Sequence, residues 1–131
     1  MFRSFAIAVA LLLSFISATA QSSDCNDAQD QATLNRCADQ ELRAADVDLN
    51  RTYRALTRQL DAQSASRIEK AQRAWIAYRD AMCAFEGAPS MGGSINAMVM
   101  SNCLARITKI QVQLLERHLY CEEGDVSCVR E

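Results

Sequence analysis

Six cysteines are the residues of this chain whose type and spacing most directly suggest chemistry. They are Cys25, Cys37, Cys83, Cys103, Cys121 and Cys128. Cysteines can act as nucleophiles, ligate metals or form disulfides, and the cellular compartment largely decides among these outcomes. Residues 1–20 contain Arg3, an apolar run from Phe5 to Ile16, and then Ala18-Thr19-Ala20, a pattern typical of a cleavable export signal. An even number of cysteines after such a signal predicts disulfides, because exported proteins mature under oxidising conditions.

The predicted mature chain begins at Gln21 and forms one domain, residues 21–131, with a short C-terminal disulfide tail. Its length is enough for one small core. The whole chain has 14 basic and 16 acidic residues, and losing Arg3 with the signal changes the formal net charge from −2 to about −3. A mildly acidic domain lacks the basic stripe of a nucleic-acid binder, so no nucleic-acid partner is expected.

No membrane anchor is expected on the mature chain. A second apolar run of spanning length is missing from the sequence. A bacterial lipoprotein needs a cysteine at the cleavage point, whereas Cys25 lies four residues beyond Gln21. The signal and the cysteines therefore predict a periplasmic or secreted protein.

The mature chain predicts an all-α fold. One proline and four glycines are few helix breakers, and helix-forming residues dominate the composition. Apolar residues recur at steps of three and four in three stretches, which is the pattern of amphipathic helices. The stripes are Leu42, Ala45, Leu49, Tyr53, Leu56 and Leu60; Ile68, Ala71, Trp75, Tyr78, Met82 and Phe85; and Val99, Cys103, Ile107, Ile110 and Leu114. Three such helices with short connections predict an antiparallel bundle stapled by disulfides.

Local signals predict where these helices begin. The first should start near Gln31. A tight hairpin at 61–65 should lead into the second helix, where Ser66 and Glu69 have the spacing of a capping box. Ser94 is a plausible N-cap for the third helix.

The segment 86–93 is the part of the sequence best suited to an irregular backbone. It contains three of the four glycines, and Gly87 and Pro89 should end the second helix. Glycine permits positive φ and the close approach of another chain. Gly92, Gly93 and Ser94 are therefore candidate partner-binding residues. The alternative is that this segment is only a long turn pinned by a disulfide.

Six cysteines allow 15 pairings, so the number of cysteines alone leaves the connectivity open. Helix geometry favours the pairs Cys25–Cys37, Cys83–Cys103 and Cys121–Cys128. The second pair can meet across an antiparallel hairpin, and the third can close a turn-like tail. On one continuous helix the first pair would lie about 18 Å apart, so the segment that begins at Cys25 must fold back over the first helix.

Two charged residues flank the apolar stripe of the second helix. Arg79 and Asp80 could recognise a partner, and they are carried as candidate binding residues. Their position favours the alternative that they form ion pairs between helices of the bundle. Trp75, which lies within the stripe, is expected in the core.

No catalytic or metal-binding constellation emerges from the sequence. His118 is the only histidine, and no Gly-x-Ser-x-Gly element accompanies it. One histidine with oxidised cysteines cannot make a zinc site. Met82, Met91, Met98 and Met100 could suit Cu(I), but filling gaps in a small core is the better interpretation. The sequence predicts a protein that is not an enzyme and that uses no metal or cofactor.

A tryptophan element, a glycine turn and a cysteine element form a distinctive set. The motifs are Ala71-Gln72-Arg73-Ala74-Trp75-Ile76-Ala77-Tyr78-Arg79-Asp80 followed by Cys83, Gly92-Gly93-Ser94, and Asn102-Cys103-Leu104 with Thr108. Cys25, Cys37 and the spacing of Leu49-Asn50, Tyr53 and Leu56 accompany them upstream. This set resembles the LprI-like lysozyme-inhibitor N-terminal domain family from Cys25 to Leu119.

The resemblance implies a small exported helical domain that binds lysozyme and blocks peptidoglycan cleavage. This chain departs from the family at several points: it lacks the cysteine that lipid-anchors the namesake, it has Gln111 where the family often has arginine, and its Cys121/Cys128 tail looks like an addition. The expected partner is lysozyme. The alternative is a non-inhibitory interaction module that binds another protein of the envelope.

Overall fold

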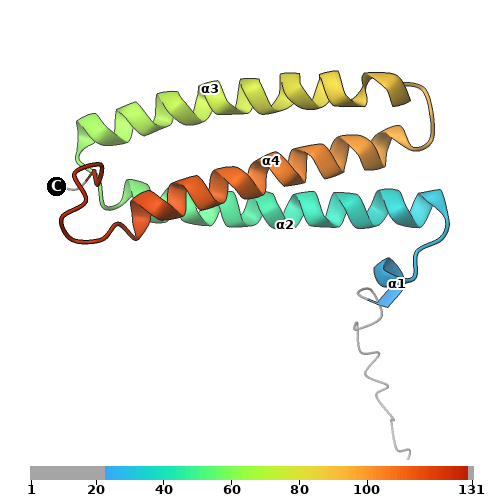
Figure 1. Ribbon diagram of the computed structural model, residues 1–131, viewed down its shortest axis with the longest axis horizontal. Coiled ribbons are helices and arrows are strands. Elements are labelled where there is room, and N and C mark those ends of the chain that lie inside the picture. Colours follow the sequence, from blue (N-terminus) through green and yellow to red (C-terminus); the bar gives the residue numbers. More distant parts are fainter. Residues whose placement is uncertain (1–22, 130–131) are drawn as a thin grey trace, which may run out of the picture.

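A computed structural model describes residues 23–129, which contain three long helices. These are α2 (Gln31–Thr57), α3 (Ala62–Gly87) and α4 (Asn96–Leu119), with the single turn α1 (Ser23–Asn26) in front and the 3-10 turn η1 (Ala88–Ser90) after α3. Figure 1 shows the three long helices side by side, with α4 between α2 and α3 and with α3 running antiparallel to both. The described residues contain no strand, so the predicted all-α bundle is confirmed.

The helices pack unevenly. The most extensive contact is between α2 and α4, and α3 packs mainly on α4, while its backbone approaches that of α2 much less closely. The core accordingly has two buried clusters: Leu49, Leu56, Leu115 and Leu119 between α2 and α4, and Cys83, Cys103 and Ile107 between α3 and α4. Trp75 is partly buried and packs against both clusters. The predicted core position of Trp75 is therefore confirmed.

Half of the residues in the predicted apolar stripe of α3 are exposed, so the prediction that they face the core is wrong for them. Tyr78 is 56% exposed and Phe85 is 76% exposed, and on α4 Ile110 and Leu114 are exposed as well. The physical reason is that α3 lies at the edge of the bundle and packs mainly on α4, so only a narrow strip of its surface is covered. By contrast, the predicted stripe of α2 is buried or partly buried throughout.

Two predicted helix starts are also wrong. The N-cap of α3 is Asp61, whose carboxylate accepts a hydrogen bond from the backbone N–H of Ser64 at 2.8 Å, so Ser66 lies inside the helix and caps nothing. Because α2 ends at Thr57, the turn between α2 and α3 precedes the predicted hairpin. The N-cap of α4 is Ile95 and makes no side-chain cap, so Ser94 is not the cap.

The three disulfides join Cys25 to Cys37, Cys83 to Cys103 and Cys121 to Cys128, which is the connectivity expected from the sequence. The first bond holds α1 against the start of α2, as the fold-back argument required. The second joins α3 to α4 one turn before the end of α3. The third closes a ring in the C-terminal tail, outside the three-helix core. The predicted export signal, residues 1–20, lies outside the described residues.

The N-caps of α2 and α3 predict a loss of stability in acid. Hydrogen bonds from the backbone and side chain of Thr33 lower the pKa of Asp30 from 3.8, and those of Ser64 do the same for the pKa of Asp61. Since the folded pKa values are depressed, the stabilisation is present above the unfolded value and is lost as pH falls through the folded values. We expect the melting temperature measured by circular dichroism to fall below about pH 4. In the variant Asp30→Asn/Asp61→Asn, which keeps capping side chains that do not titrate, the decrease should be smaller; an unchanged decrease would contradict this origin.

Candidate binding site at the α3–α4 turn

The connection between α3 and α4 is a series of tight turns. The backbone N–H of Met91 donates to the carbonyl of Ala88 at 3.2 Å, and that of Gly93 donates to the carbonyl of Ser90 at 3.0 Å. The N–H of Asn96 then donates to the carbonyl of Gly93 at 3.1 Å. Overlapping turns leave the backbone of this segment little freedom, so the segment is a rigid projection and not a loose loop.

Side chains and a disulfide fix the base of this turn. The Asn96 side-chain amide donates to the carbonyl of Gly87 at 3.0 Å and to the hydroxyl of Ser90 at 2.9 Å. The carbonyl of Ser94 accepts a hydrogen bond from the Asn35 side chain of α2 at 2.9 Å. The Cys83–Cys103 disulfide joins the flanking helices, and Cys83 is completely buried. These contacts tie the turn to all three helices.

Two of the predicted binding residues are glycines for different reasons. Gly92 has φ +81°, a conformation that side-chain-bearing residues rarely adopt, and a Cβ atom there would meet nothing within 4 Å. At Gly93 a Cβ atom would lie 3.2 Å from the carbonyl oxygen of Ser90. Gly92 therefore offers open backbone to a partner, while Gly93 is needed to close the turn.

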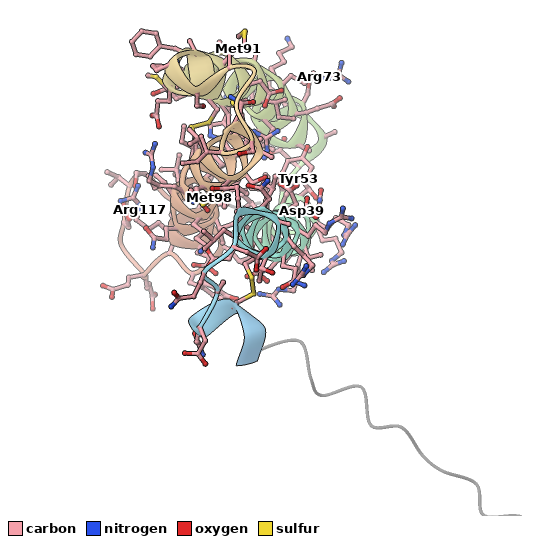
Figure 2. The ribbon with its side chains drawn as sticks, turned by 90° about the vertical axis from the view of Figure 1, so that its right-hand side faces the viewer. Asp39, Tyr53, Arg73, Met91, Met98 and Arg117 are labelled. Carbon is pink, nitrogen blue, oxygen red and sulfur yellow. A yellow bond between two sulfur atoms is a disulfide. The ribbon has the colours of Figure 1, made fainter. Side chains whose placement is uncertain are left out.

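Large apolar side chains are exposed in the turn and at the helix ends that flank it. Phe85 is 76% exposed, Met91 is 77% exposed, and Ile95 is exposed as well. Figure 2 looks onto this end of the bundle and shows Met91 at its outer edge beside α3, with Asp39 and Met98 on the other side, toward α2. We refer to Phe85, Met91, Gly92 and Ile95 as the turn patch.

Sequence reasoning missed the apolar part of the turn patch, although one signal could have found it. Cys83 must face α4 to reach Cys103, and Phe85 follows it by two residues. Two residues correspond to about 200° around an α-helix, so Phe85 has to point away from α4. The 3.6-residue pattern placed Phe85 in the core because it was read without this constraint.

The structure places Arg79 and Asp80 away from the turn patch, about two helical turns before the end of α3. An Arg79 Nη1 atom lies 3.5 Å from an Asp46 carboxylate oxygen on α2 and donates to the Thr108 hydroxyl on α4 at 3.3 Å. Its Nε donates to Asp80 at 2.9 Å, and its guanidinium carbon lies 5.1 Å from the centroid of the Trp75 ring. Arg79 thus connects all three long helices, which is the interhelical alternative considered for it.

A second polar contact in the interior, between two glutamine side chains, was not predicted from the sequence. The side-chain amide of Gln111 donates to the side-chain oxygen of Gln72, and both residues are buried between α3 and α4. Gln111 and Gln72 therefore satisfy each other across the interface between α3 and α4. Such contacts orient α3, because each buried amide needs its partner.

The turn patch consists of apolar side chains and glycine backbone. It contains no titratable side chain, and the adjacent Glu86 is paired, since Arg106 Nη2 donates to both of its carboxylate oxygens at 2.8 and 2.7 Å. Among residues 23–129, no group of three His, Cys, Asp or Glu side chains could hold a metal ion. His118 lies near the C-terminal end of α4, far along the bundle from the turn.

Comparison with known proteins identifies the class of this protein. Residues 22–115 match the family model of the lysozyme inhibitor LprI, so the chain belongs to that family and the resemblance seen in its motifs is confirmed. It is 44% identical over 99 residues to an uncharacterized protein of Rhizobium meliloti (strain 1021), covering 66% of this chain and 71% of the relative. The comparison with solved structures found no match. In the part of the chain that the structure describes, no helix has the length and apolar character needed to cross a bilayer.

Proposed function

We propose that this protein is a periplasmic or secreted inhibitor of lysozyme that inserts the α3–α4 turn into the active-site cleft. The observation that carries the proposal is the match of residues 22–115 to the lysozyme inhibitor LprI family. Residues 1–20 would direct export, and residues 21–131 would be the mature domain. The three disulfides support an oxidising compartment outside the cytoplasm.

The geometry of the turn supports its role as the inhibitory segment. A lysozyme cleaves its polysaccharide with two carboxyl groups that flank the glycosidic bond in a cleft, so an inhibitor must occupy that cleft. A segment that is already rigid loses little conformational entropy on binding. The hydrogen-bonded turn meets this requirement, and the exposed Phe85 and Met91 provide apolar anchors. Gly92 and Gly93 allow close approach of the backbone, and Ser94 is exposed beside them.

In this proposal Arg79 and Asp80 are not central contact residues for lysozyme. Arg79 holds the three helices in place, and its side chain is only 17% exposed. Asp80 is open to solvent and beside Arg79, so it can contribute at most to the edge of an interface. The turn patch with Gly93 and Ser94 is the centre of the proposed contact.

A lysis assay tests the proposal. The mature protein at micromolar concentration should slow the loss of turbidity of a bacterial suspension treated with lysozyme, with animal-type and phage-type enzymes assayed separately. The variant Phe85→Ser/Met91→Ser should raise the inhibition constant by at least about tenfold, because it removes both exposed anchors. Gly92→Val/Gly93→Val should abolish inhibition, since valine does not tolerate the positive φ at Gly92.

The matched control is Val47→Ser, which removes an exposed apolar side chain from α2 and should inhibit as the wild type does. All variants should keep the helical circular dichroism spectrum. Full inhibition by both turn variants would show that another surface contacts the enzyme. Absence of inhibition by the wild type against every lysozyme class would leave the non-inhibitory envelope module as the function.

A further inference from the structure

The end of the bundle opposite the turn patch has a cavity that the lysozyme proposal does not use. Figure 1 shows the C-terminal tail lying beside the α2–α3 turn at this end, away from η1. The cavity has a volume of about 280 Å³. Its lining residues are Leu56, Leu60, Ser64, Arg67, Ile68, Ala71, His118 and Val129.

The floor of this end cavity is apolar and continuous with the main core. Leu56 belongs to the buried α2–α4 cluster, and Leu60 and Ile68 pack against that cluster. Val129, which follows the Cys121–Cys128 ring, forms part of the wall. An open apolar cavity of this kind leaves hydrocarbon surface in contact with water, so an aliphatic group that enters it gains the hydrophobic free energy of burial.

The rim of the end cavity carries two basic side chains. Arg67 and His118 both line it, and within residues 23–129 neither has a carboxylate partner within 4 Å. Asp61, in the α2–α3 turn, directs its carboxylate to Ser64. Asp125, in the tail, accepts hydrogen bonds from Ser127. Arg67 interacts electrostatically with Asp61, and His118 with Asp125. Neither basic side chain forms an ion pair within 4 Å, so both can still face an anion at the mouth of the cavity.

We propose that the end cavity binds an amphiphile with one aliphatic chain and an anionic head group. The chain end would contact Leu56, Leu60 and Ile68, and the head group would face Arg67 and His118. A volume of 280 Å³ lies at the lower end of the range for ligand pockets, which suits a short aliphatic chain and excludes a large ring system. In this proposal the Cys121–Cys128 disulfide ring keeps the following residue, Val129, in the wall of the cavity.

The probe for the experiment is sodium octanoate, with 1-octanol as the neutral ligand of matched chain length. In a titration of the isotopically labelled mature protein followed by NMR, octanoate should shift the amide signals of residues around Ile68 and Ala71 and saturate with a Kd of about 1 mM. Arg67→Gln should weaken octanoate binding about twofold to fivefold and leave octanol binding unchanged. Arg73→Gln is the matched control, because Arg73 lies on the same helix, pairs with Glu69 and does not line this cavity.

A variant that fills the cavity tests whether a loss of binding occurs without a loss of folding. Ala71→Leu should occupy the cavity, abolish octanoate binding and keep the melting temperature of the wild type, since leucine is a good helix former. Equal octanoate affinity in Arg67→Gln and wild type, or unchanged binding by Ala71→Leu, would overturn the proposal. So would the absence of saturable shifts at about 20 mM octanoate, roughly twenty times the expected Kd.

The anionic amphiphile could be a free aliphatic acid or a lipid still embedded in a membrane. Co-sedimentation with phosphatidylglycerol vesicles distinguishes these sources. Vesicle binding that Ala71→Leu abolishes would support a membrane lipid as the source, and octanoate binding without vesicle binding would support a free acid. Vesicle binding without octanoate binding would overturn the proposal. The end cavity does not depend on lysozyme inhibition, so either proposal can fail while the other holds.

Discussion

The variant Cys83→Ala/Cys103→Ala should lose about 3 kcal/mol of unfolding free energy, because the disulfide restricts the unfolded chain over a separation of 20 residues. Both cysteines are buried in the α3–α4 cluster, so the variant also loses sulfur atoms from a small core. For a domain of this size the melting temperature should fall by roughly 15 °C. Chemical denaturation followed by circular dichroism measures the loss directly.

If the protein inhibits lysozyme as proposed, the same variant should also inhibit it more weakly, even under conditions in which the variant is folded. The disulfide joins the two helices that flank the α3–α4 turn, close to the turn itself. Without the disulfide the turn patch would sample more conformations and would lose more entropy on binding. Inhibition measured at a temperature where the variant is folded should therefore decrease.

Cys121→Ala/Cys128→Ala is the matched control for this prediction. Its ring closes over residues of the tail that are mostly exposed, so the tail can open without unfolding the bundle. The unfolding free energy should change by less than about 1 kcal/mol, and inhibition should persist. A similar loss for both disulfide variants would contradict the assignment of the Cys83–Cys103 bond as the one that holds the bundle together.

The second large effect is expected at Arg79. Arg79→Ala should cost about 2–3 kcal/mol, because it leaves the completely buried Thr108 hydroxyl without its interhelical partner and removes the contact to Asp46. It also exposes the face of Trp75 that the guanidinium covers. Urea denaturation monitored by Trp75 fluorescence measures the change.

Two further variants test whether the polar contacts cause this loss. Arg73→Ala removes an exposed arginine whose partner is one turn away, and it should change stability by less than about 0.5 kcal/mol. Arg79→Met/Thr108→Val replaces both partners by apolar groups, and it should recover at least about 1 kcal/mol relative to Arg79→Ala. If folded Arg79→Ala fails to inhibit lysozyme although its turn is intact, then Arg79 contacts the enzyme directly and our assignment is wrong.

Local features of the sequence determined much of this protein. The low number of helix breakers and the 3.6-residue periodicity determined three helices. The antiparallel hairpin and the short tail suggested two disulfides, and the pair Cys25–Cys37 remained. The stripe of α2 was predicted correctly because α2 packs along a broad surface of α4. The motif set, from the tryptophan element to the glycine turn, placed the chain in its family.

Only the tertiary structure decided which apolar residues are exposed and which polar residues are buried. Periodicity gives the direction of a side chain around its own helix, but the position of neighbouring helices depends on contacts between distant parts of the chain. Because α3 lies at the edge of the bundle and packs mainly on α4, Phe85 and Tyr78 are exposed while Gln72 and Arg79 are turned inward. The tail lies beside the α2–α3 turn, where Val129 completes the lining of the end cavity.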